Sequence, residues 1–363
     1  NALVEAHGNG AKVALAGKLV DKVQTRDQFR ESMDALVGKD DDTGSFRQIL
    51  ARYYMQAWAG EHGGDKNGKD VGIIVVSGDI VDGKSSYDSA GGDTIAYLLG
   101  KATRDDSVAA VVLRVNSPGG SVVAAEKIRR AELRLKQSGK PLVVSMSTLA
   151  ASGGYWISMD ADSIFAEPTT ITGSIGIFGL LPNITQPLDK LGIHGDGVGT
   201  SPLAGAFRIS RPLTQPERAI IQAQVDYGYT LFTQGVAAGR KLPLAKVKKI
   251  AQGRVWSGAA AQKLGLVDHF GGLHAALTKA ATLAGVNLKQ YRVKRFDRQP
   301  SLLQLVSEQF GVHASAKALT QVAVSTPWLK PFAEAAQTLR HFNDPKGQYA
   351  YCFCKPVAAP GID

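Results

Sequence analysis

The sequence predicts an α/β fold in which buried parallel strands end in glycine-rich turns that open helices. Two stretches support this prediction. An apolar, β-branched run at 109–115 leads into Asn116-Ser117-Pro118-Gly119-Gly120, and a second run at 141–146 leads into Ala150-Ala151-Ser152-Gly153-Gly154-Tyr155. A helical pattern follows each turn. Because the chemistry of open α/β sheets lies where parallel strands end and helices begin, we expect functional residues in both turns.

The remaining elements follow from periodicity and flanking residues. Apolar runs predict strands at 71–76 and 164–166, and helical spacing predicts helices at 29–37, 94–102 and 273–283. The helix after Gly120 has core-facing residues at helical spacing and ends at Gly139. Those core-facing residues are Ala125, Ile128, Ala131 and Leu135.

A further helix is predicted downstream. Thr214 and Glu217 form the capping-box pattern that opens a helix. One apolar face of this helix then carries Ile220, Ala223, Tyr227 and Leu231. In contrast, the G-x-G-x-G run from Gly195 to Gly199 lacks the spacing of a dinucleotide fingerprint, and we expect a plain loop there.

Composition limits the class of protein. The chain has 363 residues, of which 44% are hydrophobic and 20% charged, enough for one large or two modest globular domains. Its net charge of +10 comes from scattered Lys and Arg. This favours a solvated surface, or one that faces anionic lipid headgroups, over nucleic-acid binding. The chain starts with Asn rather than Met, and we expect it to be part of a longer protein.

The only two cysteines, Cys352 and Cys354, form a C-x-C near the C-terminus. Two thiols without a neighbouring histidine cannot make a zinc site, and no metal or organic cofactor is expected. The sequence leaves open whether the pair forms a disulfide or stays as inert thiols.

A sequence pattern that occurs twice in the chain predicts the domain organisation. Leu19-Val20-Asp21 followed by the helix at 29–37 matches Leu266-Val267-Asp268 followed by the helix at 273–283, an offset of 247 residues (268 − 21). A repeat of this length is a domain. We therefore expect residues 1–38 to be the tail of a preceding repeat and 39–70 to be a linker with an aromatic-rich bridge at 46–58. The globular domain spans 71–286, and 287–363 is an extension for packing or oligomer contacts.

The pair of turns also predicts acyl-transfer chemistry. Ser152 would place its Oγ at the start of a helix, where unpaired N–H groups favour negative charge. Glycines let backbone N–H groups approach a substrate carbonyl without a Cβ in the way. The N–H groups of Gly120 and Gly153 are therefore the expected oxyanion donors, and Ser152 is the expected nucleophile.

Four ordered motifs resemble signal peptide peptidase A, a family of bacterial serine peptidases (peptidase family S49) with the Clp-protease/crotonase fold. They are V-V-L-R-V-N-S-P-G-G-S, A-A-S-G-G-Y-W-I-S, T-G-S-I-G-I-F-G and G-R-V-W-S-G-x-A-A-x-x-x-G-L-V-D. The match runs from about Val71 to the C-terminus. It is closest to the C-terminal, catalytic repeat of the long two-repeat form.

A serine nucleophile needs a general base, and the resemblance implies a neutral lysine. Short members carry it in a loop that corresponds to Gly199-Thr200-Ser201-Pro202, where this chain has proline. In the long form the lysine comes from the first repeat, so we expect it outside this chain. Lys127 and Lys140 are predicted to be exposed charges, and His194, the first histidine after Ser152, a surface-loop residue.

The resemblance implies a serine endopeptidase that degrades cleaved signal peptides at the periplasmic face of the bacterial inner membrane. It also implies an upstream repeat that supplies the lysine, an upstream anchor and a homo-oligomer, with a tetramer as one possibility. Small and aliphatic substrate side chains would suit a pocket near Gly119, Met146, Tyr155, Ser174 and Ile175. Two alternatives remain open, a non-catalytic scaffold subunit and a crotonase-like acyl-CoA enzyme.

Overall fold

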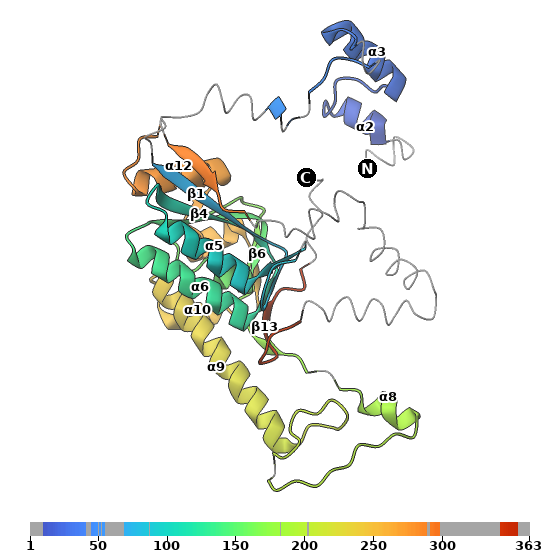
Figure 1. The fold of residues 1–363 in the computed structure, drawn as a ribbon, viewed down its shortest axis with the longest axis vertical. Helices are drawn as coiled ribbons and strands as arrows, with labels where there is room; N and C mark the ends of the chain where they lie inside the picture. Colours follow the sequence, from blue (N-terminus) through green and yellow to red (C-terminus); the bar gives the residue numbers. More distant parts are fainter. Residues whose placement is uncertain are drawn as a thin grey trace. The chain divides into compact units, whose positions relative to one another are not determined.

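The computed structural model describes residues 10–40, 45–49, 51, 53–54, 69–86, 88–181, 183–201, 203–288, 291–297 and 342–354 (Figure 1). The chain divides into two compact units, Asn1–Gly63 and Gly64–Asp363. Most of the predicted linker and bridge at 39–70, Pro202, and most of the predicted extension after 286 lie outside the described residues.

The first unit contains two helices, α2 (Gly10–Ala16) and α3 (Arg26–Val37). Thr25 caps α3: its Oγ1 accepts a hydrogen bond from the Gln28 N–H at 3.3 Å, and the Gln28 side chain accepts one from the Thr25 N–H at 2.9 Å. This reciprocal pair satisfies two N–H groups that the helix start leaves unpaired, and it fixes where α3 begins.

The same local structure recurs 247 residues later, in α11 (Gly258–Leu264) and α12 (Leu273–Leu283). The Leu19 N–H donates to the Ala14 carbonyl at 2.9 Å, and the equivalent Leu266 N–H donates to the Ala261 carbonyl at 2.8 Å. Helices α3 and α12 begin at equivalent positions. That residues 1–38 end a preceding repeat stays a prediction, and this shared geometry supports it.

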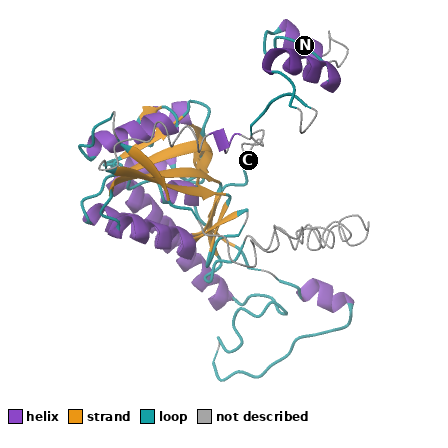
Figure 2. Ribbon diagram, turned by 45° about the horizontal axis from the view of Figure 1, so that its top comes forward, coloured by secondary structure: helices purple, strands orange, loops and turns teal. Residues whose placement is uncertain are grey.

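The second unit is built on an eight-stranded sheet in the order β10-β8-β6-β4-β1-β12, with β7 beside β6 and β11 beside β7. The strands are orange in Figure 2, with helices packed around them. All neighbours run parallel except β10, which is antiparallel to β8. The predicted α/β class with a parallel sheet is confirmed. The strands are β1 (Asp70–Ser77), β4 (Val108–Ser117), β6 (Leu142–Ala151), β7 (Ser163–Ala166), β8 (Ile171–Gly173), β10 (Val255–Ser257), β11 (His269–Phe270) and β12 (Arg292–Arg295).

Helices cover both faces of this sheet. Helices α5 (Gly92–Arg104) and α6 (Val122–Gln137) lie side by side on one face, where they bury Leu99 and Ile128 against strand residues such as Leu113 (Figure 1). Helix α12 covers the other face through Ala276 and Ala280. Burial on both faces explains why the strands are continuous apolar runs in the sequence.

A smaller, five-stranded sheet lies beside the turn that follows β4, in the order β3-β2-β5-β13-β9. Its strands are β2 (Asp79–Val81), β3 (Ser89–Gly91), β5 (Gly119–Ser121), β9 (Phe178–Gly179) and β13 (Gln348–Tyr351). Two segments of the predicted C-terminal extension are therefore part of the fold. Strand β12 pairs with β1 in the main sheet, and β13 pairs with β5 in the small one.

The long helix α9 (Gln215–Gly239) begins at the predicted capping box but buries a different face from the one expected. Tyr227 is 65% exposed and Leu231 is 38% exposed, whereas Phe232 and Val236 are fully buried. The Phe232 ring packs on Trp156, with ring centroids 4.6 Å apart. The buried apolar face of α9 is therefore offset by one residue from the predicted face. The other helices are α7 (Gly153–Trp156), α8 (Thr185–Lys190) and α10 (Leu244–Ile250).

Helix α6 carries a buried acid. Glu132 is fully buried, and neither carboxylate oxygen has a hydrogen-bond partner among the described residues. Loss of hydration, reinforced by the nearby Asp160 charge, raises the pKa of Glu132 well above its ordinary value of 4.5. The side chain therefore stays protonated in the folded protein at pH values where it ionises in the unfolded chain.

We predict that this group makes stability fall as the pH rises. The folded state holds the Glu132 proton more tightly, so its contribution is complete below pH 4.5 and is lost between 4.5 and the raised pKa. The loss is about 1.4 kcal/mol per pH unit. Urea unfolding of the native protein and Glu132→Gln should show this slope only in the native protein. Parallel pH curves for the two proteins would contradict it.

Candidate active site

Ser152 lies at a sharp turn between β6 and α7. Its backbone has φ 54° and ψ −113°, a conformation that a residue with a side chain rarely adopts. Two hydrogen bonds hold it: the Ser152 N–H donates to the Gly173 carbonyl, and the Trp156 N–H donates to the Ser152 carbonyl, each at 2.8 Å. Such strain costs on the order of 1–3 kcal/mol and persists only where surrounding contacts impose it.

Helix α7 after Ser152 is a single turn, shorter than the sequence pattern suggested. A helix dipole therefore adds little at the serine, and the individual N–H groups of the turn matter more. The helix predicted after Gly120 does form, and the Ser121 Oγ caps it by accepting the Ala124 N–H at 3.1 Å.

The structure brings the two predicted oxyanion donors together. A Cβ atom built on Gly153 would lie 3.0 Å from both the Gly119 Cα and the Gly120 nitrogen. Backbones this close require residues without a side chain. The Gly119 N–H donates to the Ser117 Oγ at 3.1 Å, so Gly120 and Gly153 remain the candidate donors.

Gly120 is constrained from the other side as well. Its φ of +155° is one that glycine adopts without strain, and a Cβ at this position would lie 1.9 Å from the Ile80 carbonyl oxygen. Strand β2, which carries Ile80, pairs with β5 at this residue. Any larger residue here must displace the backbone that presents the Gly120 N–H.

The Ser152 side chain has no base beside it in the described part of the chain. Ser152 is 1% exposed, and its Oγ has no hydrogen-bond partner. The Lys127 Nζ pairs instead with Asp93 at 2.6 Å and Asp82 at 3.3 Å, and the bond to Asp93 raises its pKa. A lysine that holds its proton more tightly is a poorer base.

Lys140 is half-buried rather than exposed as predicted. Its Nζ donates to the carbonyls of Ala102, Thr103 and Asp105 at 2.7–2.9 Å and so caps the end of α5. Loss of hydration lowers the pKa of Lys140, but the three N–H groups of its ammonium already donate to carbonyls at the end of α5. His194 is on an exposed loop beside Asp189, at 3.1 Å, as predicted for a surface histidine.

Three of the predicted pocket residues pack inside the domain. Met146, Tyr155 and Ile175 are at most 1% exposed and belong to the main core cluster, where the Tyr155 hydroxyl donates to the Leu266 carbonyl at 2.9 Å. The structure gives their side chains a packing role, and their contact with substrate stays a prediction. Ser174 lines a cavity of about 500 Å³ together with Ile177, Tyr229 and Tyr351.

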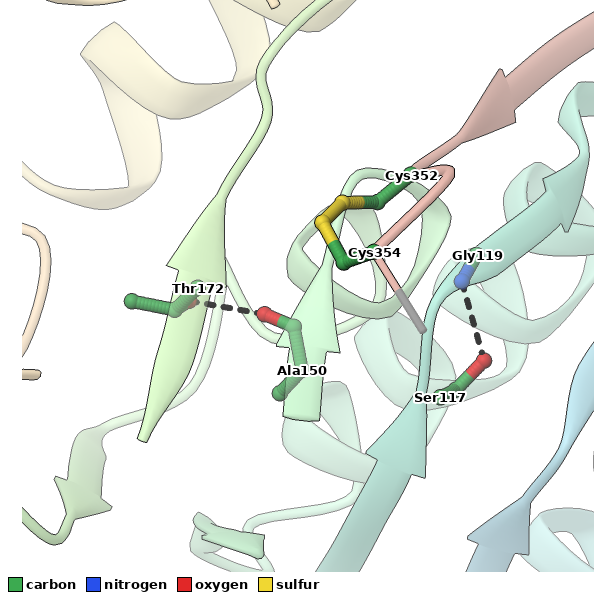
Figure 3. The surroundings of a disulfide bond; sticks show 6 residues. All are labelled: Ser117, Gly119, Ala150, Thr172, Cys352 and Cys354. Carbon is green, nitrogen blue, oxygen red and sulfur yellow. Dashed lines mark hydrogen bonds between the residues drawn. A yellow bond between two sulfur atoms is a disulfide. The ribbon is translucent and has the colours of Figure 1, made fainter. Parts of the chain in front are cut away.

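A C-terminal segment that the sequence patterns did not indicate packs beside the site. Cys352 and Cys354 form a disulfide near Gly119 and the end of β6, where the Ala150 carbonyl accepts the Thr172 hydroxyl at 2.7 Å (Figure 3). The Cys352 N–H donates to the Pro118 carbonyl at 2.8 Å. The turn sequence Asn343-Asp344-Pro345-Lys346-Gly347 before an alternating strand pattern is the signal that would have found this segment.

The chain is similar in sequence to known peptidases. The model of peptidase family S49 matches residues 134–287. Protease 4 of Haemophilus influenzae is 41% identical over 354 residues, which are 95% of this chain and 56% of that protein. A putative protease of Synechocystis is 34% identical over 227 residues, which are 60% of this chain and 82% of that protein.

The chain thus spans about half the length of Protease 4, 56% of it. Among solved structures, a mutant ClpP1 from Listeria monocytogenes aligns with 56% of this chain and 94% of that chain. Its TM-score is 0.38 at 15% sequence identity, and the fold class rests on the strand order of this chain itself.

We predict that Gly120→Val lowers the rate of acyl transfer to Ser152 by 10²-fold or more, about 3 kcal/mol, because it displaces one oxyanion donor. The measurement is kcat/KM for a peptide substrate in the complete protein. Gly100→Ala is the matched control, since a Cβ there meets only the flexible end of Arg104 at 3.4 Å. A Gly120→Val protein within about threefold of the control would show that the hole is elsewhere.

Proposed function

Because the chain belongs to peptidase family S49, we propose that it is the nucleophile-bearing part of a serine endopeptidase of the signal peptide peptidase A type. The observation that carries this proposal is the strained turn at Ser152, whose next residue, Gly153, packs against the backbone of Gly119 and Gly120. A buried hydroxyl without a partner is costly to keep, and nucleophilic catalysis explains it.

In the proposed reaction, the Ser152 Oγ attacks the substrate carbonyl and a neutral lysine takes its proton. The carbonyl oxygen becomes an oxyanion that accepts hydrogen bonds from Gly120 and Gly153. The lysine then gives the proton to the leaving amine, and water hydrolyses the acyl-enzyme through the same hole.

We place the lysine in a preceding repeat. The Ser152 Oγ has no base among the described residues, and the first unit has the local structure of α11 and α12. Leu266 is fully buried in the domain, whereas its equivalent Leu19 is 80% exposed. An apolar residue this exposed fits a preceding repeat that would cover it in the complete protein.

The proposed substrates are signal peptides released from preproteins, and the proposed location is the periplasmic face of the bacterial inner membrane. The net charge of +10 suits a surface near anionic lipids. No helix in the described part of the chain is long and apolar enough to cross a membrane. We further propose a homo-oligomer, for which light scattering of the complete protein is the test.

We predict that this chain alone folds but hydrolyses peptides orders of magnitude more slowly than the two-repeat protein. A serine without its base keeps only the catalysis that binding and the oxyanion hole supply. The two-repeat protein should be most active at alkaline pH, because a lysine must lose its proton to act as base. The measurement is peptide hydrolysis by both proteins across pH.

Ser152→Ala in each protein is the control for this comparison. It should abolish the activity of the two-repeat protein. If the isolated chain is fully active and Ser152→Ala removes that activity, the base lies within these 363 residues. If the two-repeat protein stays active after Ser152→Ala, Ser152 is not the nucleophile.

A further inference from the structure

We propose that Glu126 is a positioning residue for the candidate oxyanion hole. Its carboxylate holds Trp156 and so fixes the Ser152 turn relative to Gly120, and its effect on catalysis rests on the proposed peptidase function. Glu126 lies in α6, the helix that begins two residues after Gly120. Trp156 is the last residue of α7, which begins directly after Ser152. A bond between these two side chains therefore links the two segments that carry the oxyanion donors.

The Trp156 indole makes this link. Its Nε1–H donates to the Glu126 Oε2 at 3.1 Å, and the tryptophan is 1% exposed. A buried indole N–H is costly without a partner, and water cannot readily take the place of this acceptor. Hydrogen bonds to a carboxylate are also stronger than those between neutral groups. The bond therefore fixes where the indole ring lies.

The backbone of Trp156 carries the effect to the nucleophile. Its N–H donates to the Ser152 carbonyl at 2.8 Å, one of the two bonds that impose the strained Ser152 backbone. The Ser152 carbonyl and the Gly153 N–H belong to one planar peptide group. The bond that holds the carbonyl therefore also sets the direction of the Gly153 N–H, a candidate oxyanion donor.

Further contacts limit the movement of Trp156 and of the segment after it. The Phe232 ring of α9 packs on the indole, with ring centroids 4.6 Å apart. One turn further along α6, the Arg129 Nε donates to the Asp160 carboxylate at 2.5 Å. Helix α6 thus holds the chain after Ser152 at two points, and Glu126 is the one nearer to the nucleophile.

Two arginines orient the Glu126 carboxylate. The Arg129 Nη1 lies 3.3 Å from each carboxylate oxygen, and the Arg130 Nε donates to Oε1 at 3.1 Å. The Arg130 side chain is 70% exposed, and an exposed ion pair of this kind contributes little to stability. Arg130→Ala is therefore a matched control, because it removes one partner of Glu126 and leaves the bond to Trp156 in place.

The first test measures the bond itself in the full chain and needs no peptidase activity. The chain has four tryptophans, and isotope-labelled tryptophan gives one indole N–H signal for each in a nuclear magnetic resonance spectrum. Trp156→Phe assigns the signal of Trp156. Glu126→Leu should shift this signal and speed its exchange with solvent by about tenfold or more, because the N–H loses its acceptor. Glu126→Gln, which keeps an acceptor oxygen, and Arg130→Ala should change it little.

The second test measures peptide hydrolysis by the two-repeat protein. Glu126→Leu should lower kcat by about tenfold or more with KM within about threefold, since oxyanion donors act chiefly in the transition state. Glu126→Gln should recover most of this loss, and Arg130→Ala should not reduce kcat. Leu277→Ala controls for lost stability, because Leu277 belongs to the core cluster under α12, on the other face of the sheet.

A double-mutant cycle tests whether Glu126 acts through Trp156. Trp156→Phe keeps an aromatic ring beside Phe232 but has no N–H to donate. Once that bond is gone, adding Glu126→Leu should lower kcat by no more than about twofold. If the two effects multiply in full, Glu126 acts by another route and the proposal is wrong. Should Glu126→Leu fail to fold, Trp156→Phe alone removes the same bond and should lower kcat in the same way.

The two tests also separate this proposal from the peptidase function. A shifted indole signal in Glu126→Leu with kcat within threefold of the unmodified protein would show a purely structural role and overturn the proposal. An unshifted signal would overturn it as well. If the two-repeat protein hydrolyses no peptide, the peptidase function fails. Amide exchange then decides whether Glu126 holds the turn, since the Trp156 amide should lose protection in Glu126→Leu and keep it in Arg130→Ala.

Discussion

The site depends on one constraint, the close approach of three backbone segments at glycines that carry no side chain. A Cβ on Gly120 would lie 1.9 Å from the Ile80 carbonyl oxygen, and one on Gly119 would lie 2.5 Å from the Gly153 nitrogen. These contacts join β2, β5 and the Ser152 turn at one point. Any side chain there would push the segments apart and separate the two N–H groups that the proposed chemistry needs.

The second feature is that the site is formed but, within the described residues, lacks its base. The hydrogen bonds from Ser152 to Gly173 and from Trp156 to Ser152 impose the strained backbone, whereas the Oγ itself has no partner there. Lys127 and Lys140 are committed to ion pairs or to a helix end. Under the proposed function, activity would require a second repeat, because the nucleophile and its base come from different repeats.

Both ends of the described chain bear on this assembly. The first unit repeats the geometry of α11 and α12, down to a matching hydrogen bond at Leu19 and Leu266, but leaves its apolar residues exposed. Strand β13 places Ala350 opposite Gly120. Under the proposed function, the first feature belongs to the completion of the active site.

The sequence by itself determined the parallel sheet, the order of its main helices and the two glycine turns, because these follow from local periodicity and from backbone conformations that only glycine adopts easily. Only the tertiary structure decided which face of α9 is buried, that Lys140 caps α5, and that Met146, Tyr155 and Ile175 belong to the core. It also decided that β12 and β13 join sheets more than 200 residues upstream, as the Asp70–Arg292 and Gly120–Ala350 pairs show. These outcomes depend on contacts between residues far apart in the sequence, and local sequence patterns do not show which distant residues make contact.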